Sequence, residues 1–117
     1  TGYVSYHFWR YCRASNRFDC DLLIHEATFL QSHVDIANEH LHSTAAGAAR
    51  TAVECSAKHL ALTHYSGRLD KHDESLTEAR EIHSSVVALS DGDRLILNDD
   101  LSLTHLFKIE DGWTQQV

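Results

Sequence analysis

Short apolar runs alternate with amphipathic, helix-forming stretches along the first half of the chain. Residues 21–25 and 59–63 are apolar runs that end in polar residues, as buried parallel strands do. Between them, residues 34–41 are weakly helical. Residues 44–57 carry alanines and a valine at helical spacing, with Ser43 as the expected N-cap. The pattern therefore predicts a slim helix that packs closely on a sheet.

The second half continues this alternation and then changes to hairpins. A capping box at Ser75 and Glu78 predicts a helix that runs to about Ser84. Further strands are predicted at 86–89, 94–97 and 101–109, with turns at 91–92, 98–100 and 111–112. The order strand, helix, strand, helix, strand, then hairpins predicts an α/β layer followed by an antiparallel edge.

Polar residues follow the first two predicted parallel strands, at the sheet edge where α/β proteins bind their ligands. The segments concerned are 25–28, 42–44 and 63–68. We therefore expect three histidines, His25, His42 and His64, to gather at this edge.

Each candidate residue has both a chemical and an ordinary interpretation. His64 at a rigid strand end suits a metal ligand, or it is a hydrogen-bonded surface residue. Glu26 beside His25 and His42 suits proton transfer, or it forms an ordinary ion pair. Arg68 suits a bidentate phosphate contact, or it is a solvated loop residue.

The length and composition of the chain limit which kinds of protein these interpretations can apply to. The chain has 117 residues, enough for one domain or less, and contains no apolar run of the roughly 20 residues that a membrane span needs. Seventeen acidic against ten basic residues disfavour a free-standing nucleic-acid-binding module, but not a catalytic piece. The chain starts at Thr1 and contains no methionine, so we expect a fragment.

Cysteine usage does not indicate a disulfide framework. Three cysteines, Cys12, Cys20 and Cys55, form an odd set without a Cys-x-x-Cys spacing, so a cysteine zinc knuckle is not indicated either. We expect reduced thiols in a cytosolic protein.

Taken in order, the motifs resemble ribonuclease Z, the tRNA 3′-processing endonuclease of the metallo-β-lactamase superfamily. The segments that carry the resemblance are Leu-Leu-Ile-His-Glu-Ala-Thr-Phe at 22–29, His-Ser-Thr-Ala at 42–45, Leu-Thr-His-Tyr-Ser-Gly-Arg at 62–68 and Ala-Leu-Ser-Asp-Gly at 88–92. The resemblance implies an α/β fold, the C-terminal half of an αββα sandwich and thus an incomplete domain. In that division, 19–98 is the domain part, 99–117 an edge hairpin or tail, and 1–18 a diverged or frameshifted junction.

The resemblance also implies roles for eight residues. These are a proton shuttle for Glu26 and His42, zinc ligation for His64, substrate binding for Ser66 and Arg68, and shaping of the site for His25, Ser43 and Thr44. Two zinc ions in a complete site would activate water and stabilise charge, while the shuttle protonates the leaving 3′ oxygen. The implied partner is precursor tRNA, with a homodimer for the full-length protein and a cytoplasmic location.

The main zinc motif of the family, His-x-His-x-Asp-His, is absent from this sequence. The single His-x-His pair, His40 and His42, continues with Ser43 and Thr44 instead. One ligand cannot hold two zinc ions, so the 117 residues alone are expected to be inactive. The other histidines are expected to be structural or solvated: His7, His33, His40, His59, His72, His83 and His105. The alternatives are another phosphodiesterase or arylsulfatase-like hydrolase of the superfamily, or an inactive truncated remnant.

The N-terminal segment departs from the family. A Ser-Gly-Asp-Thr segment is expected shortly before residue 22, but no acidic residue precedes Asp19. Shifting the codons of residues 6–12 by one nucleotide permits Ile-Ile-Ser-Gly-Asp-Thr-Ala, so we hypothesise a frameshift up to about Arg13. The alternative is a diverged strand with aromatic core residues. The nucleotide sequence tests this, because codons incompatible with Ser-Gly-Asp-Thr in the shifted frame would contradict the hypothesis.

Overall fold

The computed structural model describes residues 8–11, 20–66 and 73–115, with 8–11 described by their backbone. The strands are β1 Phe8–Tyr11, β2 Leu22–Glu26, β3 His59–Thr63, β4 Val86–Ala88, β5 Arg94–Leu97, β6 Leu103–Ile109 and β7 Gly112–Gln115. The helices are the 3-10 turn η1 Gln31–His33, α1 Val34–Glu39, α2 Ala45–Glu54 and α3 Asp73–Arg80. The predicted α/β class is confirmed, and so is the order of the predicted helices and strands from β2 to β6. The short η1 and the last strand β7 were not predicted, and β1 falls in the segment for which a diverged strand was the alternative to a frameshift.

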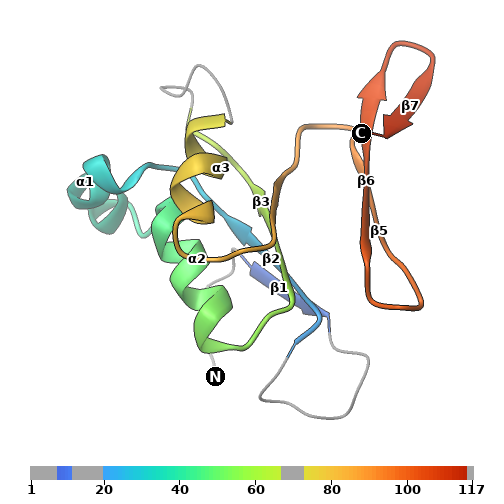
Figure 1. Cartoon of the computed structure of the whole chain (residues 1–117). Coiled ribbons are helices and arrows are strands. Elements are labelled where there is room, and N and C mark those ends of the chain that lie inside the picture. The colour runs from blue at the N-terminus through green and yellow to red at the C-terminus, as the bar shows by residue number, and fades with distance from the viewer. Residues whose placement is uncertain (1–7, 12–19, 67–72, 116–117) are drawn as a thin grey trace.

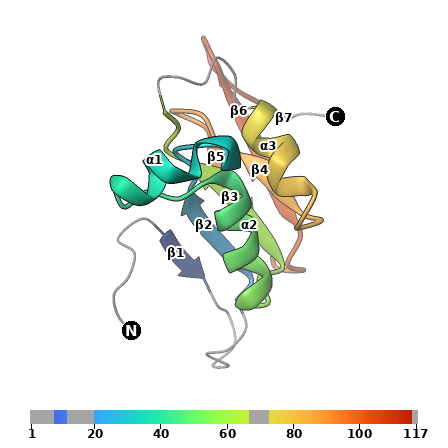
Figure 2. The ribbon, with the colours of Figure 1, turned by 90° about the vertical axis from the view of Figure 1, so that its left-hand side faces the viewer.

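The strands form two sheets. In the first, of order β1-β2-β3-β4, β2, β3 and β4 run parallel and β1 pairs antiparallel with β2. The second is an antiparallel sheet of order β5-β6-β7. Helices α2 and α3 cover one side of the first sheet, and the β5–β7 sheet lies on its other side (Figures 1 and 2). The chain therefore supplies one helical layer and two sheet layers.

The expectation that the hairpins extend the parallel sheet as an antiparallel edge is wrong. The N–H of Leu89 still bonds the Leu62 carbonyl, which continues the β3–β4 pairing by one residue. A turn from Ser90 to Asp93 follows, closed by a 3.0 Å bond, with Gly92 at a left-handed φ of 88°. This turn leads the chain away from the first sheet, so the later strands pair only with one another.

The core lies between α2 and the first sheet. Leu23, Leu60 and Leu62 are fully buried on the sheet side. Facing them, α2 contributes small side chains, Ala45, Ala48, Ala49 and Ala52, all completely buried. Because alanines leave little bulk on the helix surface, the helix axis approaches the sheet closely and the leucines fill the space.

Of the three predicted helices, the first begins at residue 34 as predicted, and the other two begin one or two residues away from their predicted starts. Thr44, not Ser43, is the N-cap of α2, because its Oγ1 accepts the Gly47 N–H at 2.9 Å. Helix α3 begins at Asp73, so Ser75 lies inside it and is buried. The Glu78 carboxylate does not close a capping box with Ser75. It accepts the N–H groups of Ala46 and Gln31, at 2.9 and 3.0 Å, across the helix pair.

Three histidines outside the motifs have the structural roles expected of them. His59 bonds the Ser85 hydroxyl at 2.6 Å and the Leu101 carbonyl at 2.7 Å, which ties the first sheet to the second. His83 bonds the Ala57 carbonyl at 2.8 Å, and His105 bonds Asp93 at 2.8 Å. His33 and His40 are exposed, whereas His7 and His72 lie outside the described residues.

Large apolar side chains remain exposed on the second sheet. Ile96, Ile109 and Trp113 are 43%, 47% and 38% exposed. Exposed apolar side chains gathered on one sheet are unusual for a protein surface and often mark a surface that packs against another element. In the part of the chain that the structure describes, no helix combines the length and the apolar character that a bilayer crossing needs.

Replacing Thr44 by Ala is expected to lower the free energy of unfolding by about 1 to 2 kcal/mol, because the first turn of α2 loses its cap. The bond from the Thr44 hydroxyl to Gln31 Oε1 is lost as well. Urea denaturation of Thr44→Ala, Thr44→Ser and Ser43→Ala measures this. Thr44→Ser should retain most of the stability. A larger loss in Ser43→Ala than in Thr44→Ala would restore Ser43 as the cap.

Asp93 makes the start of the second sheet sensitive to pH. Partial burial raises its pKa, but the N–H donors of Lys108 and Ser90 and the His105 ring together hold the pKa of Asp93 below its ordinary value. A lowered pKa stabilises the fold above the unfolded-state value of about 3.9, and this stabilisation is lost as pH falls through the folded-state pKa. Urea midpoints measured between pH 7 and 2 should show this loss. Asp93→Asn should flatten the curve below about pH 4; an unchanged acid limb would contradict the assignment.

Candidate active site

One carboxylate and two imidazoles meet at the carboxyl ends of β2 and β3. Glu26 ends β2, His64 follows β3 directly, and His42 precedes α2. One potential ligand atom from each residue lies within 4.8 Å of the others, the one such group found among the described residues. The predicted gathering of histidines is therefore confirmed for His42 and His64.

The Glu26 carboxylate is 2% exposed and is surrounded by hydrogen-bond donors. Its Oε1 accepts the Ser43 N–H at 2.6 Å, and its Oε2 accepts the Thr28 N–H at 3.2 Å and the Thr28 hydroxyl. Such charge-assisted bonds offset the cost of burying a carboxylate. They also leave Glu26 poorly placed to be a metal ligand, because both of its oxygens are already engaged.

The Thr28 hydroxyl determines the tautomer of His64. Its oxygen lies 2.7 Å from His64 Nδ1 and also contacts Glu26 Oε2. A carboxylate only accepts, so the single hydroxyl proton points to Glu26 and the hydroxyl oxygen accepts Nδ1–H from His64. His64 Nε2 then carries a lone pair directed away from this network. A carboxylate–hydroxyl–imidazole chain of this kind orients a metal-binding histidine.

Sequence reasoning assigned no role to Thr28. The available signal was its spacing two residues after Glu26, which places both side chains on the same side of an extended segment. The Thr28 carbonyl also accepts the Ser66 N–H at 2.8 Å, which holds the loop after β3 against the end of β2.

His42 lies beside the same carboxylate and remains partly open to solvent. Its Nδ1 is 3.5 Å from Glu26 Oε2, and its side chain is 26% exposed. The ring stacks on His64 with 5.4 Å between centroids and an interplanar angle of 22°, and it meets Phe29 edge-on. Because Nδ1 is turned toward Glu26, Nε2 is the ring nitrogen on the side away from this carboxylate.

Main-chain hydrogen bonds between Phe29 and the residues that follow His42 hold His42 in this position. The N–H of Phe29 bonds the Ser43 carbonyl at 3.2 Å, and the N–H of Ala45 bonds the Phe29 carbonyl at 2.9 Å. Leu41 takes a left-handed φ of 60° just before His42, and His64 takes one of 58°. Positive φ is strained for residues with a side chain, by about 1 to 2 kcal/mol, and such strain concentrates at functional sites.

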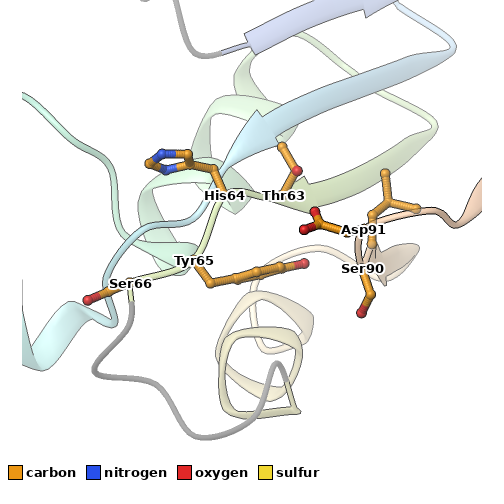
Figure 3. A pocket seen from close by; sticks show the side chains of 7 residues that line it. Thr63, His64, Tyr65, Ser66, Ser90 and Asp91 are labelled. Carbon is orange, nitrogen blue, oxygen red and sulfur yellow. The ribbon is translucent and has the colours of Figure 1, made fainter.

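Two depressions adjoin the cluster. One, of about 380 Å³, is lined by Thr63, His64, Tyr65, Ser66, Leu89, Ser90 and Asp91. Figure 3 shows the rings of His64 and Tyr65 pointing in opposite directions from this loop, with Tyr65 turned toward Ser90 and Asp91. The other, of about 240 Å³, includes His42, Ser43 and Thr44 in its lining. Each imidazole thus borders its own depression.

Tyr65 lines the larger depression. Its hydroxyl donates to the Leu62 carbonyl at 2.9 Å, and burial raises the pKa of Tyr65 above its ordinary range. Tyr65 is therefore a neutral phenol at physiological pH and acts as a packing and hydrogen-bonding group.

The remaining predicted site residues divide into three groups. Ser43 contributes its backbone N–H to Glu26, and Thr44 caps α2 with its side-chain hydroxyl, so both hold the segment around His42 in place. His25 is buried in register with Leu62, and its Nδ1 bonds the Glu26 carbonyl, so it contacts the site through the backbone. Ser66 lines the larger depression, whereas Arg68 lies outside the described residues.

Comparison with solved structures places this arrangement in a known class. The metallo-β-lactamase fold protein YhfI from Bacillus subtilis matches with a TM-score of 0.55 and 26% identity, over 69% of this chain and 34% of that one. The chain has the fold of part of a metallo-β-lactamase domain.

Comparison with curated proteins confirms the resemblance to ribonuclease Z. Ribonuclease Z from Bacillus cereus, Bacillus thuringiensis and Bacillus anthracis is 43% identical to this chain over 86 residues. The match covers 70% of this chain and 28% of each relative, so the chain spans well under half of the relatives' length. No family model matches the sequence.

Replacing Thr28 by Val is expected to release the tautomer of His64, because the isosteric side chain cannot accept the Nδ1 proton. Nitrogen NMR of the labelled imidazole distinguishes the two tautomers directly. The parent chain and Thr28→Ser should show Nδ1 protonated in His64, and Thr28→Val should show a mixture. A parent spectrum with the proton on Nε2 would contradict the hydrogen-bond assignment.

Proposed function

We propose that this chain supplies the proton shuttle and one zinc ligand of a ribonuclease Z-like endonuclease that removes 3′ trailers from precursor tRNA. The observation that carries the proposal is the Glu26–Thr28–His64 chain with His42 stacked beside it. The 43% identity to ribonuclease Z supports the substrate class.

The residues present fit one side of a zinc site. His64 offers Nε2, and the Glu26–Thr28 pair provides the second-layer support that a zinc-bound imidazole usually has. Zinc, when bound, supplies Lewis-acid stabilisation of charge on the phosphodiester. His64 alone cannot hold the metal, so the other ligands must come from the His-x-His-x-Asp-His motif that this sequence lacks.

Glu26 and His42 fit the role of a proton shuttle. The buried carboxylate beside Nδ1 would orient the imidazole, and Nε2 would then donate a proton to a leaving oxygen. The partial exposure of His42 lets a substrate oxygen reach it. Glu26 itself is too buried to contact a substrate, so it acts through His42.

Substrate contacts are proposed for Ser66 and Arg68. Ser66 lines the depression next to His64, and a guanidinium two residues further along suits bidentate phosphate binding. A local basic group matters because the chain carries a formal charge of −7 and would otherwise repel RNA. The homodimer, the cytoplasmic location and zinc as the metal remain proposals based on the resemblance.

Two other functions compete with this one. The likeness to YhfI, named only for its fold, agrees equally well with another hydrolase of the superfamily, such as a phosphodiesterase or an arylsulfatase-like enzyme. The third alternative is an inactive remnant, consistent with the missing zinc motif. The stacked His42 and the buried carboxylate favour a retained catalytic function over a remnant.

A chimeric enzyme distinguishes these alternatives. The aligned segment of Bacillus cereus ribonuclease Z is replaced by that of this chain, and cleavage of precursor tRNA is compared with that of a generic phosphodiester. A folded chimera that removes the 3′ trailer supports the proposal. Cleavage of the generic substrate alone supports another hydrolase, and a folded, zinc-loaded but inactive chimera supports the remnant. The isolated 117-residue chain is expected to cleave neither substrate.

Within an active chimera, single variants separate the two histidines. His64→Ala is expected to lower both zinc content and cleavage, because a ligand is lost. His42→Ala should retain zinc and slow cleavage by about 10²- to 10⁴-fold, the usual contribution of a positioned acid. His40→Ala, an exposed histidine two residues earlier, is the matched control. An unchanged rate in His42→Ala would exclude the shuttle.

A further inference from the structure

Two cysteines that are distant in sequence meet at the end of the layer opposite the active site. Cys20 lies just before β2, and Cys55 is the C-cap residue of α2. Their sulfur atoms are 3.5 Å apart, although 35 positions separate them along the chain. Cys20 is 3% exposed and Cys55 is half-buried, so the pair is reachable from the Cys55 side.

The backbone around the pair is already held together. The N–H of Lys58 bonds the Cys20 carbonyl at 3.1 Å, and the N–H of His59 bonds the Asp21 carbonyl at 3.1 Å. These bonds fix the entry to β2 beside the segment that follows α2. Two thiols whose sulfur atoms are 3.5 Å apart on segments held together by main-chain hydrogen bonds have a short distance to close before they reach the roughly 2.05 Å of a disulfide.

We propose that Cys20 and Cys55 form a reversible intramolecular disulfide, a modification site separate from the zinc and proton-transfer cluster. A peroxide serves as the oxidant. The Cys55 sulfur attacks one peroxide oxygen, the O–O bond breaks, and a sulfenic acid and water result. The Cys20 sulfur then attacks the Cys55 sulfur, the S–O bond breaks, and the thiol proton leaves with the hydroxide as water. Two thiols are oxidised, and one hydrogen peroxide is reduced to two waters.

The bond would close a loop that contains much of the active site. Residues 20–55 include β2, Glu26, Thr28 and His42, and the disulfide restricts this segment in the unfolded chain. The oxidised chain should therefore unfold at a higher temperature. A dithiol reductant would reopen the bond by thiol–disulfide exchange.

Peroxide oxidation of the native chain tests the proposal. The chain is treated with one equivalent of hydrogen peroxide, alkylated in denaturant and mapped by mass spectrometry. The expected result is one alkylated cysteine, Cys12, and a linked peptide pair containing residues 20 and 55. Dithiothreitol should restore three alkylated cysteines. The same oxidation of the denatured chain should instead give a mixture of pairings, which shows that the fold selects the pair.

Two variants show whether the result depends on the Cys20–Cys55 pair, and the first of them leaves the pair itself unchanged. Cys12→Ser removes the competing thiol and should still form the link, and Cys55→Ser should leave Cys20 open to alkylation. The thermal midpoint of Cys12→Ser should rise by roughly 10 °C on oxidation. A native link that involves Cys12, a disulfide between two chains, or three alkylated cysteines after peroxide would overturn the proposal. A Cys20–Cys55 disulfide that forms without a rise in the thermal midpoint would contradict the claim that the native fold accommodates this bond without strain.

Discussion

The burial of the Glu26 carboxylate is the constraint on which the site depends. A carboxylate that is 2% exposed must have its oxygens satisfied by the protein, and its hydrogen-bond donors come from two places along the chain. Ser43 brings the loop before α2, and Thr28 brings the chain beyond β2. Through the Thr28 hydroxyl, the same requirement extends to His64 after β3. Satisfying one charge thus aligns the three segments that contain Glu26, His42 and His64.

A second carboxylate, that of Glu78, accepts backbone hydrogen bonds at the start of α2. Glu78 on α3 accepts the N–H of Ala46, and the Thr44 side chain accepts the N–H of Gly47. Together they satisfy donors that a helix leaves open in its first turn, and the negative charge suits the positive end of the helix dipole. Because His42 precedes this turn by only two residues, the position of His42 depends on α3 as well as on β2.

The second sheet is joined to this framework by few but specific bonds. His59 links β3 to the Leu101 carbonyl, and Asp93 links the turn before β5 to Lys108 on β6. The sheet keeps Ile96 and Trp113 exposed, which is what a sheet of a layered sandwich shows where a further layer is absent. The structure therefore pairs a well-packed sheet edge, where Glu26, His42 and His64 meet, with a second sheet that exposes large apolar side chains.

The sequence by itself determined the strand and helix order from residue 21 onward and the edge where His42 and His64 meet, because periodicity and strand ends are local signals. The tertiary structure alone decided which neighbour satisfies each polar group. Thr44 rather than Ser43 became the cap, Glu78 turned to α2 instead of Ser75, and Thr28 became the link between Glu26 and His64. It also separated the hairpins into their own sheet. The bonds from Glu78 to Ala46 and from Thr28 to His64, and the pairing of the strands, join segments that are distant in the sequence, so no local pattern encodes them. The cap at Thr44 is a local bond, but Ser43 and Thr44 are both suitable caps by residue type, so the backbone conformation decides between them.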